Sequence, residues 1–362
     1  MNMKKLAGKI LAIVLCAGML LSLAACSGNS SAKEKKFLVG LVIQTQSNPY
    51  FVASAERIKE NALSRGWEFR LYDSQQDSQK EMQAFEDLVS LGADLIFVDN
   101  VDPEAVVASV QIAYDAGIPV IGIDGVMDPS AKTSTTITAA NRDGAWECGL
   151  WLAEKKKGEA IKSALISGVK GNPTGLSRRM GLMAGIIEGM YENAGTPADK
   201  DTAWAEAEGM EAQLVKSGKA KHPTLDFEIS SQGWGDWNSE GGLNAMQDIL
   251  TAHTDLNVLL AENDDMAIGA MNAIAERNME EQVLIVAGAD GQKEAYRYII
   301  DGKIGATSEN NPIKIADLAY EYADKILVEG VDPESFDKHI MTEAVCVSPS
   351  NVDRYYDPNA LF

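Results

Sequence analysis

Short apolar runs alternate along this chain with longer stretches in which apolar residues recur at helical spacing. Strand-type runs come first at residues 37–43, 68–72, 94–98 and 118–123. The stretches between them predict helices starting at Pro49, at residue 79 and at Pro103, the last ending near Ala116. Asn48-Pro49 and Asp102-Pro103 each combine a helix-capping side chain with a proline in the first turn. Short links and regular alternation predict a parallel sheet covered by helices on both faces.

A second series of the same kind begins near Asn141. The predicted helices are 143–156, 175–191, 239–253 and 265–277, and the predicted strands are 163–167, 225–230, 258–261 and 283–287. The chain is therefore expected to hold two doubly wound units in tandem. Residues 192–223 are polar and too long for an ordinary link, so we interpret them as a surface insertion.

Three more elements follow the second unit. The pattern predicts a strand at 304–307, a helix at 312–328 and a strand at 339–345. One interpretation is that the chain crosses back to the first unit at this point.

The N-terminal residues have the layout of a secretory signal. A segment with three lysines precedes an apolar run at 10–23, and Leu23-Ala24-Ala25-Cys26 follows. These four residues resemble a bacterial lipobox, in which the cysteine becomes the first mature residue and carries lipid; an ordinary cleaved signal is the alternative. We expect a signal peptide at 1–25, a flexible stalk at 26–36, and an extracytoplasmic protein anchored to the cell membrane by lipidated Cys26.

Charge and cysteine content narrow the choice of partners. The formal net charge is −21, which argues against nucleic acid and against electrostatic docking on anionic lipid, so contact with the membrane is expected through the anchor only. Cys148 and Cys346 remain beyond the signal region; a disulfide between them is possible, and two buried thiols are favoured. No spacing of cysteine, histidine or carboxylate residues indicates a metal site, and no cofactor is expected.

The candidate chemistry lies just after the predicted strands, where ligands of parallel α/β sheets bind. These positions carry amides, carboxylates, arginine and flat aromatic rings: Gln44, Asn48, Tyr50, Phe51, Asp99, Asn100, Asp102, Asp124, Arg178, Arg179, Trp234, Trp237, Asn263, Asp264, Asp265 and Asp290. A nucleophile–base pair and a glycine-rich phosphate loop are both missing from this set, so we predict binding and not catalysis.

This chemistry suits a neutral, polyhydroxylated ligand. Carboxylates and amides accept hydroxyl protons, arginine and asparagine donate to hydroxyl oxygens, and an aromatic plate packs on the C–H face of a sugar ring. An anionic ligand is not favoured, because carboxylates such as Asp124 and Asp290 are expected in the same cleft. Structural roles compete with these functional ones: Asp102 and Asn48 are both good helix caps, and the two tryptophans can simply anchor a loop.

Four motifs make the chain resemble the sugar-binding proteins of ABC transporters, of the ribose-binding type. They are 47–51 (SNPYF), 118–124 (IPVIGID), 242–246 (GLNAM) with 250–253 (LTAH), and 261–270 (AENDDMAIGA). The resemblance covers residue 37 to about residue 347, and the last motif is its strongest signature.

The resemblance implies a role for particular residues. Asn48, Asp124, Asn263 and Asp290 would bond sugar hydroxyls, Tyr50, Phe51 and Trp237 would present aromatic faces, Arg178 would be the ligand-binding arginine, and Asn310 falls where the ribose binder has glutamine. Gln44, Asn141 and Trp234 are further candidates, while Arg179 would face solvent or support the site.

Four departures move the expected ligand away from ribose itself. Gly125 replaces an arginine of the ribose binder, Trp237 is larger than its phenylalanine, Tyr50 adds a hydroxyl, and the segment 192–223 is extra. The expected ligand is therefore a neutral monosaccharide or a related polyol.

The resemblance also implies the architecture: the α/β fold of a type I periplasmic binding protein, with two doubly wound, Rossmann-like lobes joined by a three-crossing hinge. The crossings would fall near 138–141, 310–312 and 341–343. The N-terminal lobe would be 37–139 with 311–341, and the C-terminal lobe 140–310 with 342–362. The lobes would close over the ligand, and the closed form, a monomer, would be recognised by ABC permease subunits.

Other functions compete with this one. A transcription repressor of the same fold would need a DNA-binding domain where this chain has its signal. A glycosidase would need Asp99 and Asp102, or Asp264 and Asp265, to converge on one bond, which neighbouring positions do not favour. A sensor for a chemoreceptor or histidine kinase, or a receptor for a non-sugar small molecule, stays open as the alternative.

Overall fold

The computed structural model describes residues 36–362, of which Leu38–Phe362 form one compact unit. The predictions of a signal peptide and of lipidation at Cys26, and nearly all of the predicted stalk, lie outside the described residues. Within the described part, no helix is both long and apolar enough to cross a membrane.

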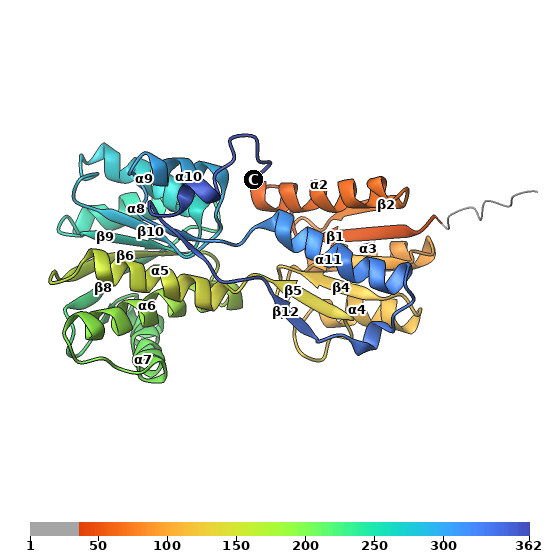
Figure 1. The fold of residues 1–362 in the computed structure, drawn as a ribbon, viewed down its shortest axis with the longest axis horizontal. Helices are drawn as coiled ribbons and strands as arrows, with labels where there is room; N and C mark the ends of the chain where they lie inside the picture. Colours follow the sequence, from red (N-terminus) through yellow and green to blue (C-terminus); the bar gives the residue numbers. More distant parts are fainter. Residues whose placement is uncertain (1–35) are drawn as a thin grey trace, which may run out of the picture. The chain divides into compact units, whose positions relative to one another are not determined.

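The first sheet has six parallel strands in the order β12-β5-β4-β3-β1-β2 (Figure 1). They are β1 (Leu38–Ile43), β2 (Glu68–Asp73), β3 (Leu95–Asp99), β4 (Val120–Ile123), β5 (Thr135–Thr138) and β12 (His339–Met341). Its helices are α2 (Pro49–Ser64), α3 (Ser78–Ser90), α4 (Val106–Asp115) and α11 (Pro312–Leu327). Helix α2 packs beside α11 on one face, and α3 packs beside α4 on the other. We call this part lobe 1.

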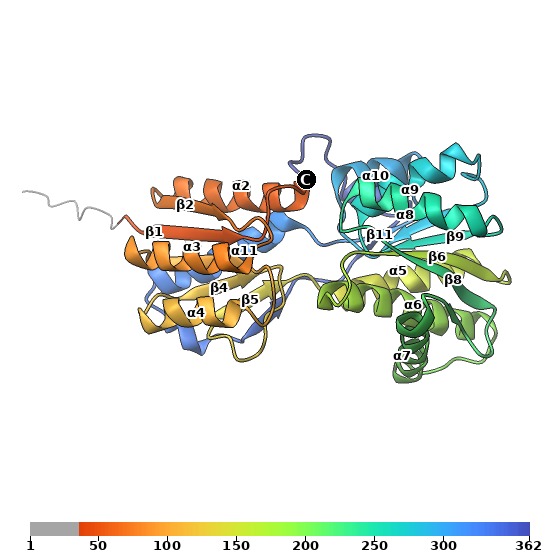
Figure 2. The ribbon, with the colours of Figure 1, turned by 180° about the vertical axis from the view of Figure 1, so that it is seen from behind.

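The second sheet has the order β10-β9-β6-β8-β7, and its first four strands are parallel (Figure 2). They are β6 (Ile161–Ser167), β8 (Phe227–Trp234), β9 (Val258–Ala261) and β10 (Leu284–Ala287); β7 (Ala220–Lys221) is antiparallel to β8. Its helices are α5 (Asn141–Lys155), α6 (Pro173–Asn193), α7 (Lys200–Ser217), α8 (Ser239–Ala252), α9 (Asp264–Glu276) and α10 (Lys293–Ile300). We call this part lobe 2.

Within residues 36–362, the chain passes between the two sheets three times. It leaves β5 for α5, leaves β11 (Thr307–Ser308) for α11, and leaves β12 for β13 (Cys346–Val347), which pairs with β11. The predicted two-lobed α/β fold with parallel sheets is confirmed.

Two parts of the chain differ from the sequence-based expectation. Strand β5 is not predicted, because its sequence Thr-Thr-Ile-Thr is mostly polar; it is nevertheless buried, and the Thr135 hydroxyl donates to the Asp337 carbonyl at 2.8 Å. The predicted surface insertion is also more than that. It contains α7, whose inward side chains pack against α6 in the core of lobe 2: Ala203, Trp204, Ala207, Met210 and Leu214.

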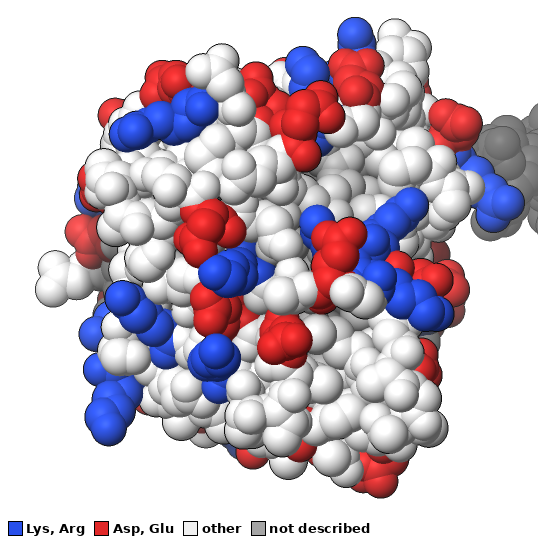
Figure 3. Space-filling model, turned by 90° about the vertical axis from the view of Figure 1, so that its left-hand side faces the viewer, with Lys and Arg blue, Asp and Glu red and all other residues white. Residues whose placement is uncertain are grey.

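One end of the molecule carries acidic and basic side chains close together. Figure 3 shows basic and acidic side chains interspersed on one end of the molecule. On that face, the formal net charge of −21 therefore does not produce one continuous acidic surface.

Glu81 of α3 makes the stability of lobe 1 dependent on pH. Its side chain is fully buried, and its Oε2 accepts a hydrogen bond from the Val101 N–H at 2.7 Å. Burial raises the pKa of Glu81 from 4.5 to about 7, although that hydrogen bond opposes the shift. The folded chain thus binds a proton between these pH values that the unfolded chain does not bind. The Glu81 contribution to stability is present at low pH and is lost as the pH rises through about 7.

Between pH 5 and pH 8 the free energy of unfolding of the parent should fall because Glu81 loses its proton. Glu81→Gln should reduce this fall by on the order of 2 kcal/mol. Urea unfolding at several pH values measures this, with Glu86→Gln on the exposed side of the same helix as the control. Equal slopes for the parent and both variants would contradict the prediction.

Candidate functional site

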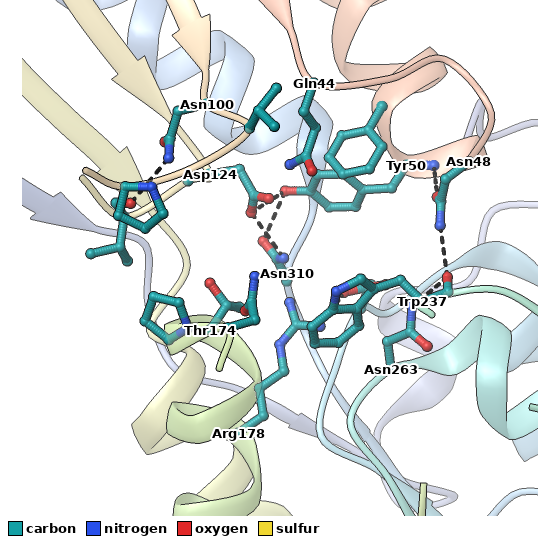
Figure 4. Close-up of a pocket in the computed structure, with 18 residues that line it drawn as sticks. Gln44, Asn48, Tyr50, Asn100, Asp124, Thr174, Arg178, Trp237, Asn263 and Asn310 are labelled. Atoms are coloured by element: carbon teal, nitrogen blue, oxygen red, sulfur yellow. Dashed lines mark hydrogen bonds and ion pairs between the residues drawn. The ribbon is translucent and has the colours of Figure 1, made fainter. Parts of the chain in front are cut away.

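A cleft between the lobes brings together residues that lie far apart in the sequence (Figure 4). All nine principal candidates line it, and so does Gln44: Asn48, Tyr50, Phe51, Asp124, Arg178, Trp237, Asn263, Asp290 and Asn310. Two further candidates do not line it. Asn141 lies behind Arg178, and Trp234 is 39% exposed at the end of β8.

Sequence reasoning missed part of the lining. Asn172, Pro173 and Thr174 at the start of α6 also face the cleft. The signal was present, because Asn172-Pro173 repeats the cap-and-proline pattern seen at Asn48-Pro49. Asn100, directly after β3, is a position that the sequence did indicate, and it lines the cleft.

Asn48 caps a helix and also contacts the opposite lobe, while its role toward a ligand stays a prediction. Its Oδ1 caps α2 by accepting the Tyr50 N–H at 2.8 Å, and its Nδ2 donates to the Trp237 carbonyl of lobe 2 at 3.0 Å. Asp102, in contrast, accepts the N–H groups of Glu104 and Ala105 as a helix cap does. Asn48 therefore joins the lobes directly at the cleft.

The Tyr50 hydroxyl connects the lobe 1 wall to the second crossing. It donates to Asp124 Oδ1 at 2.8 Å and lies 3.1 Å from Asn310 Oδ1, and Asn310 Nδ2 donates to the same Asp124 oxygen at 3.2 Å (Figure 4). Burial and the Asp124 charge raise the pKa of Tyr50 well above its usual value, so the phenol stays neutral. This triangle fixes the position of the Asp124 carboxylate.

Arg178 is the cation of the lobe 2 wall. Its side chain is 4% exposed, forms an ion pair with Asp290 at 3.0 Å, and donates to Asn141 Oδ1 at 2.9 Å and to the Glu262 carbonyl at 3.2 Å. Its guanidinium also lies 5.5 Å from the centre of the Trp237 ring. These contacts leave the guanidinium in a fixed orientation at the cleft.

Neighbouring groups shift the pKa of Asp290 in opposite directions. Burial raises its pKa, Arg178 lowers it, nearby carboxylates raise it again, and the result is a pKa of about 7. Burial thus outweighs the ion pair. Near neutral pH, Asp290 is present in both protonation states, so it can accept a hydrogen bond from a ligand hydroxyl or donate one to it.

The position of Trp237 depends on a glycine beneath it. The indole packs so closely over Gly168 that a Cβ atom there would collide with the ring. Trp237 itself has a left-handed backbone with φ of 60°, and its carbonyl accepts hydrogen bonds from Asn48 and from Asn263, the latter at 3.4 Å. The chain thus presents a flat aromatic plate at the cleft.

Arg179 supports the backbone beneath Trp237 and does not face solvent. It forms ion pairs with Glu211 of α7 at 2.6 Å and with Glu262 at 3.1 Å. Glu262 is fully buried, and its Oε2 accepts the Gly168 N–H at 2.8 Å. Of the two alternatives for Arg179, support is the correct one, and α7 contributes to that support.

Among residues 36–362, no group of three or more histidine, cysteine or acidic side chains is placed to hold a metal ion. Cys148 is buried, Cys346 is partly buried, and both are free thiols.

Comparison with known proteins identifies the family. The periplasmic binding protein domain matches residues 39–330. The chain is a periplasmic binding protein. It is 30% identical to the ribose import binding protein RbsB of Escherichia coli K12, over 90% of this chain and 94% of that protein. The RbsB of Bacillus subtilis 168 is 29% identical over 83% of this chain and 84% of its own length.

Solved structures show the same fold. A solute-binding protein from Actinobacillus succinogenes with bound D-allose has a TM-score of 0.71 at 24% identity, covering 88% of this periplasmic binding protein and all of that chain. One from Mycobacterium smegmatis with bound glycerol has a TM-score of 0.71 at 27% identity, covering 88% and 96%. The family assignment agrees with the expectation of a binding protein and not an enzyme. The roles of individual residues toward a ligand stay predictions.

Replacing Arg179→Ala should destabilise this periplasmic binding protein by roughly 3 kcal/mol, because Glu262 would be left as a buried charge without its cation. Urea unfolding at pH 8 measures the loss. Arg277→Ala, which removes an exposed arginine at the end of α9, is the control and should change stability by less than about 0.5 kcal/mol. A loss below about 1 kcal/mol for Arg179→Ala would show that the buried cluster does not depend on this residue.

Proposed function

We propose that this chain is the extracytoplasmic, lipid-anchored substrate-binding protein of an ABC importer. Its ligand is a neutral monosaccharide or a related polyol, which binds in the cleft between the lobes. The observation that carries the proposal is the composition of that cleft: two carboxylates, one arginine, several side-chain amides and an aromatic plate face one space.

The chemistry of a sugar matches these groups one by one. Each hydroxyl donates one hydrogen bond, which Asp124 or Asp290 can accept, and accepts others, which Arg178 or Asn263 can donate. The indole of Trp237 offers a surface for the C–H face of a ring. Of the residues that the structure describes, Arg178 is the one cation that lines the cleft, and the carboxyl groups of Asp124 and Asp290 line it too, which disfavours an anionic ligand.

The names of related proteins support the same ligand class. The curated relatives include ribose import binding proteins, and similar solved structures carry D-allose, myo-inositol or glycerol. All four molecules are neutral and rich in hydroxyl groups. The names also support a role in import by an ABC transporter.

Binding would be coupled to lobe closure. The lobes are connected by three crossings and by the contact between Asn48 and the Trp237 carbonyl. A sugar that bonds both walls would stabilise the closed arrangement, and the permease would then recognise the joined surface. The lipid on Cys26 would keep the protein close to that permease.

A thermal-shift screen of the purified, ligand-free protein against pentoses, hexoses, sugar alcohols and inositols tests the proposal. A ligand present at a hundred times its Kd should add about 2.7 kcal/mol of stability and raise the midpoint. A flat response across the whole panel would contradict the proposed ligand class.

For the sugar that raises the midpoint most, Trp237→Ala should weaken binding by about 1–3 kcal/mol, which is about 5- to 150-fold in Kd, because the stacking surface is lost. Titration calorimetry measures the change. Trp234→Ala is the matched control, since Trp234 lies outside the cleft lining and should leave Kd within twofold. Equal losses for both variants, or none for either, would overturn the assignment of Trp237.

A further inference from the structure

The C-terminal segment of the chain is anchored on lobe 2. After β13, the short helix η2 (Val352–Arg354) contacts α10, and the Tyr355 ring lies 6.3 Å from the Tyr296 ring. Lys293 Nζ of α10 donates to the Ala360 carbonyl at 2.7 Å. Residues 355–360 are thus fixed to lobe 2 by contacts at both ends.

The same segment ends on lobe 1. In Figures 1 and 2 it rises from lobe 2 and ends beside α2. There the Phe362 ring meets the Tyr50 ring edge to face, with centroids 5.4 Å apart and an interplanar angle of 90°. Its neighbour Leu361 is 57% exposed, whereas Phe362 is partly buried. The contact between the lobes therefore involves Phe362 specifically.

Tyr50 joins this contact to the cleft. Its ring is 4% exposed and lies edge to face with both Phe51 and Phe362, each at 5.4 Å. Its hydroxyl, at the other end of the side chain, bonds Asp124 and Asn310. A displacement of the ring would therefore move the hydroxyl away from the carboxylate.

We propose that Phe362 is a positioning residue: by packing on Tyr50 it keeps the Tyr50 hydroxyl on Asp124 and Asn310, and it links lobe 2 to α2 across the cleft. Phe362 does not line the cleft and acts only through Tyr50. Its effect on ligand affinity rests on the proposed function, in which Asp124 contacts the sugar. Its effect on the ligand-free protein does not.

Opening of the lobes would have to break this contact. Residues 355–360 are fixed to lobe 2, so Phe362 cannot follow Tyr50 unless the segment lifts from α10. The contact therefore favours the arrangement of the lobes found in this structure before any ligand binds, by the amount that an aromatic pair contributes.

Amide hydrogen exchange of the ligand-free protein tests the proposal. Phe362→Ala should speed exchange severalfold at Val52, whose N–H donates to the Asn48 carbonyl, and at Asn310, whose N–H donates to the Asp290 carbonyl. Leu361→Ala is the matched control and should leave both amides unchanged. Phe362→Tyr keeps the aromatic edge and should restore the parent rates.

A double variant separates positioning from general packing. If Phe362 acts through the Tyr50 hydroxyl, Phe362→Ala should add no further exchange at Asn310 in a Tyr50→Phe background. Parent-like exchange in Phe362→Ala, or equal effects of Phe362→Ala and Leu361→Ala, would overturn the proposal. So would full additivity with Tyr50→Phe.

Titration with D-ribose and D-allose extends the test to binding. For a sugar that binds the parent, Phe362→Ala should raise Kd about 3- to 10-fold, with Leu361→Ala within twofold. An unchanged Kd would overturn the effect on affinity. If neither sugar binds the parent, that failure counts against the proposed function for these two sugars, and the exchange rates still decide the role of Phe362.

Discussion

Lobe 2 buries two neighbouring arginines together with the carboxyl groups of Asp290 and Glu262, and the cost of burying those charges determines how the cleft is built. An unpaired buried charge is very costly, so each arginine requires a full set of partners in fixed positions. Arg178 is paired with Asp290 at the cleft surface, and Arg179 with Glu262 and Glu211 beneath it. Because Glu262 also bonds the Gly168 N–H, the backbone under Trp237 is fixed by the same charges. The aromatic plate and the cation of the site are therefore positioned together.

In lobe 1, neutral donor groups position the side chains of the cleft. The Tyr50 hydroxyl and the Asn310 amide hold Asp124, and Asn48 reaches across to the Trp237 carbonyl. The two bonds to the Asp124 carboxylate are charge-assisted, so this carboxylate is held in place as well. The bond from Asn48 to the Trp237 carbonyl joins two neutral groups and is individually modest. In the proposed function, it is this direct bond between the lobes that opening would have to break.

Most of the fold and of the cleft lining could be predicted from the sequence, because they depend on local patterns. Asn48-Pro49 marks the start of α2 by its own side-chain chemistry, and parallel strands bring their carboxyl ends to one edge whatever their order. Strand β5 could not be predicted from the sequence, because its threonines are polar and their burial depends on distant partners. One such partner is the Asp337 carbonyl, which accepts a hydrogen bond from Thr135. One face of α7 is buried only because α7 packs against α6. The ion pair between Arg179 and Glu211 depends on the same packing, so neither feature could be predicted from the local sequence. The contact between Phe362 and Tyr50 joins residues that are far apart in the sequence, and no local pattern encodes it.

A crystal structure of the protein with the sugar that stabilises it most would test the central claim directly. The account predicts electron density for one sugar between the lobes, with its ring against Trp237 and its hydroxyls bonded to Asp124, Arg178, Asn263 and Asp290. Density for the sugar outside this cleft, or a ring that makes no contact with either Trp237 or Asp290, would contradict it.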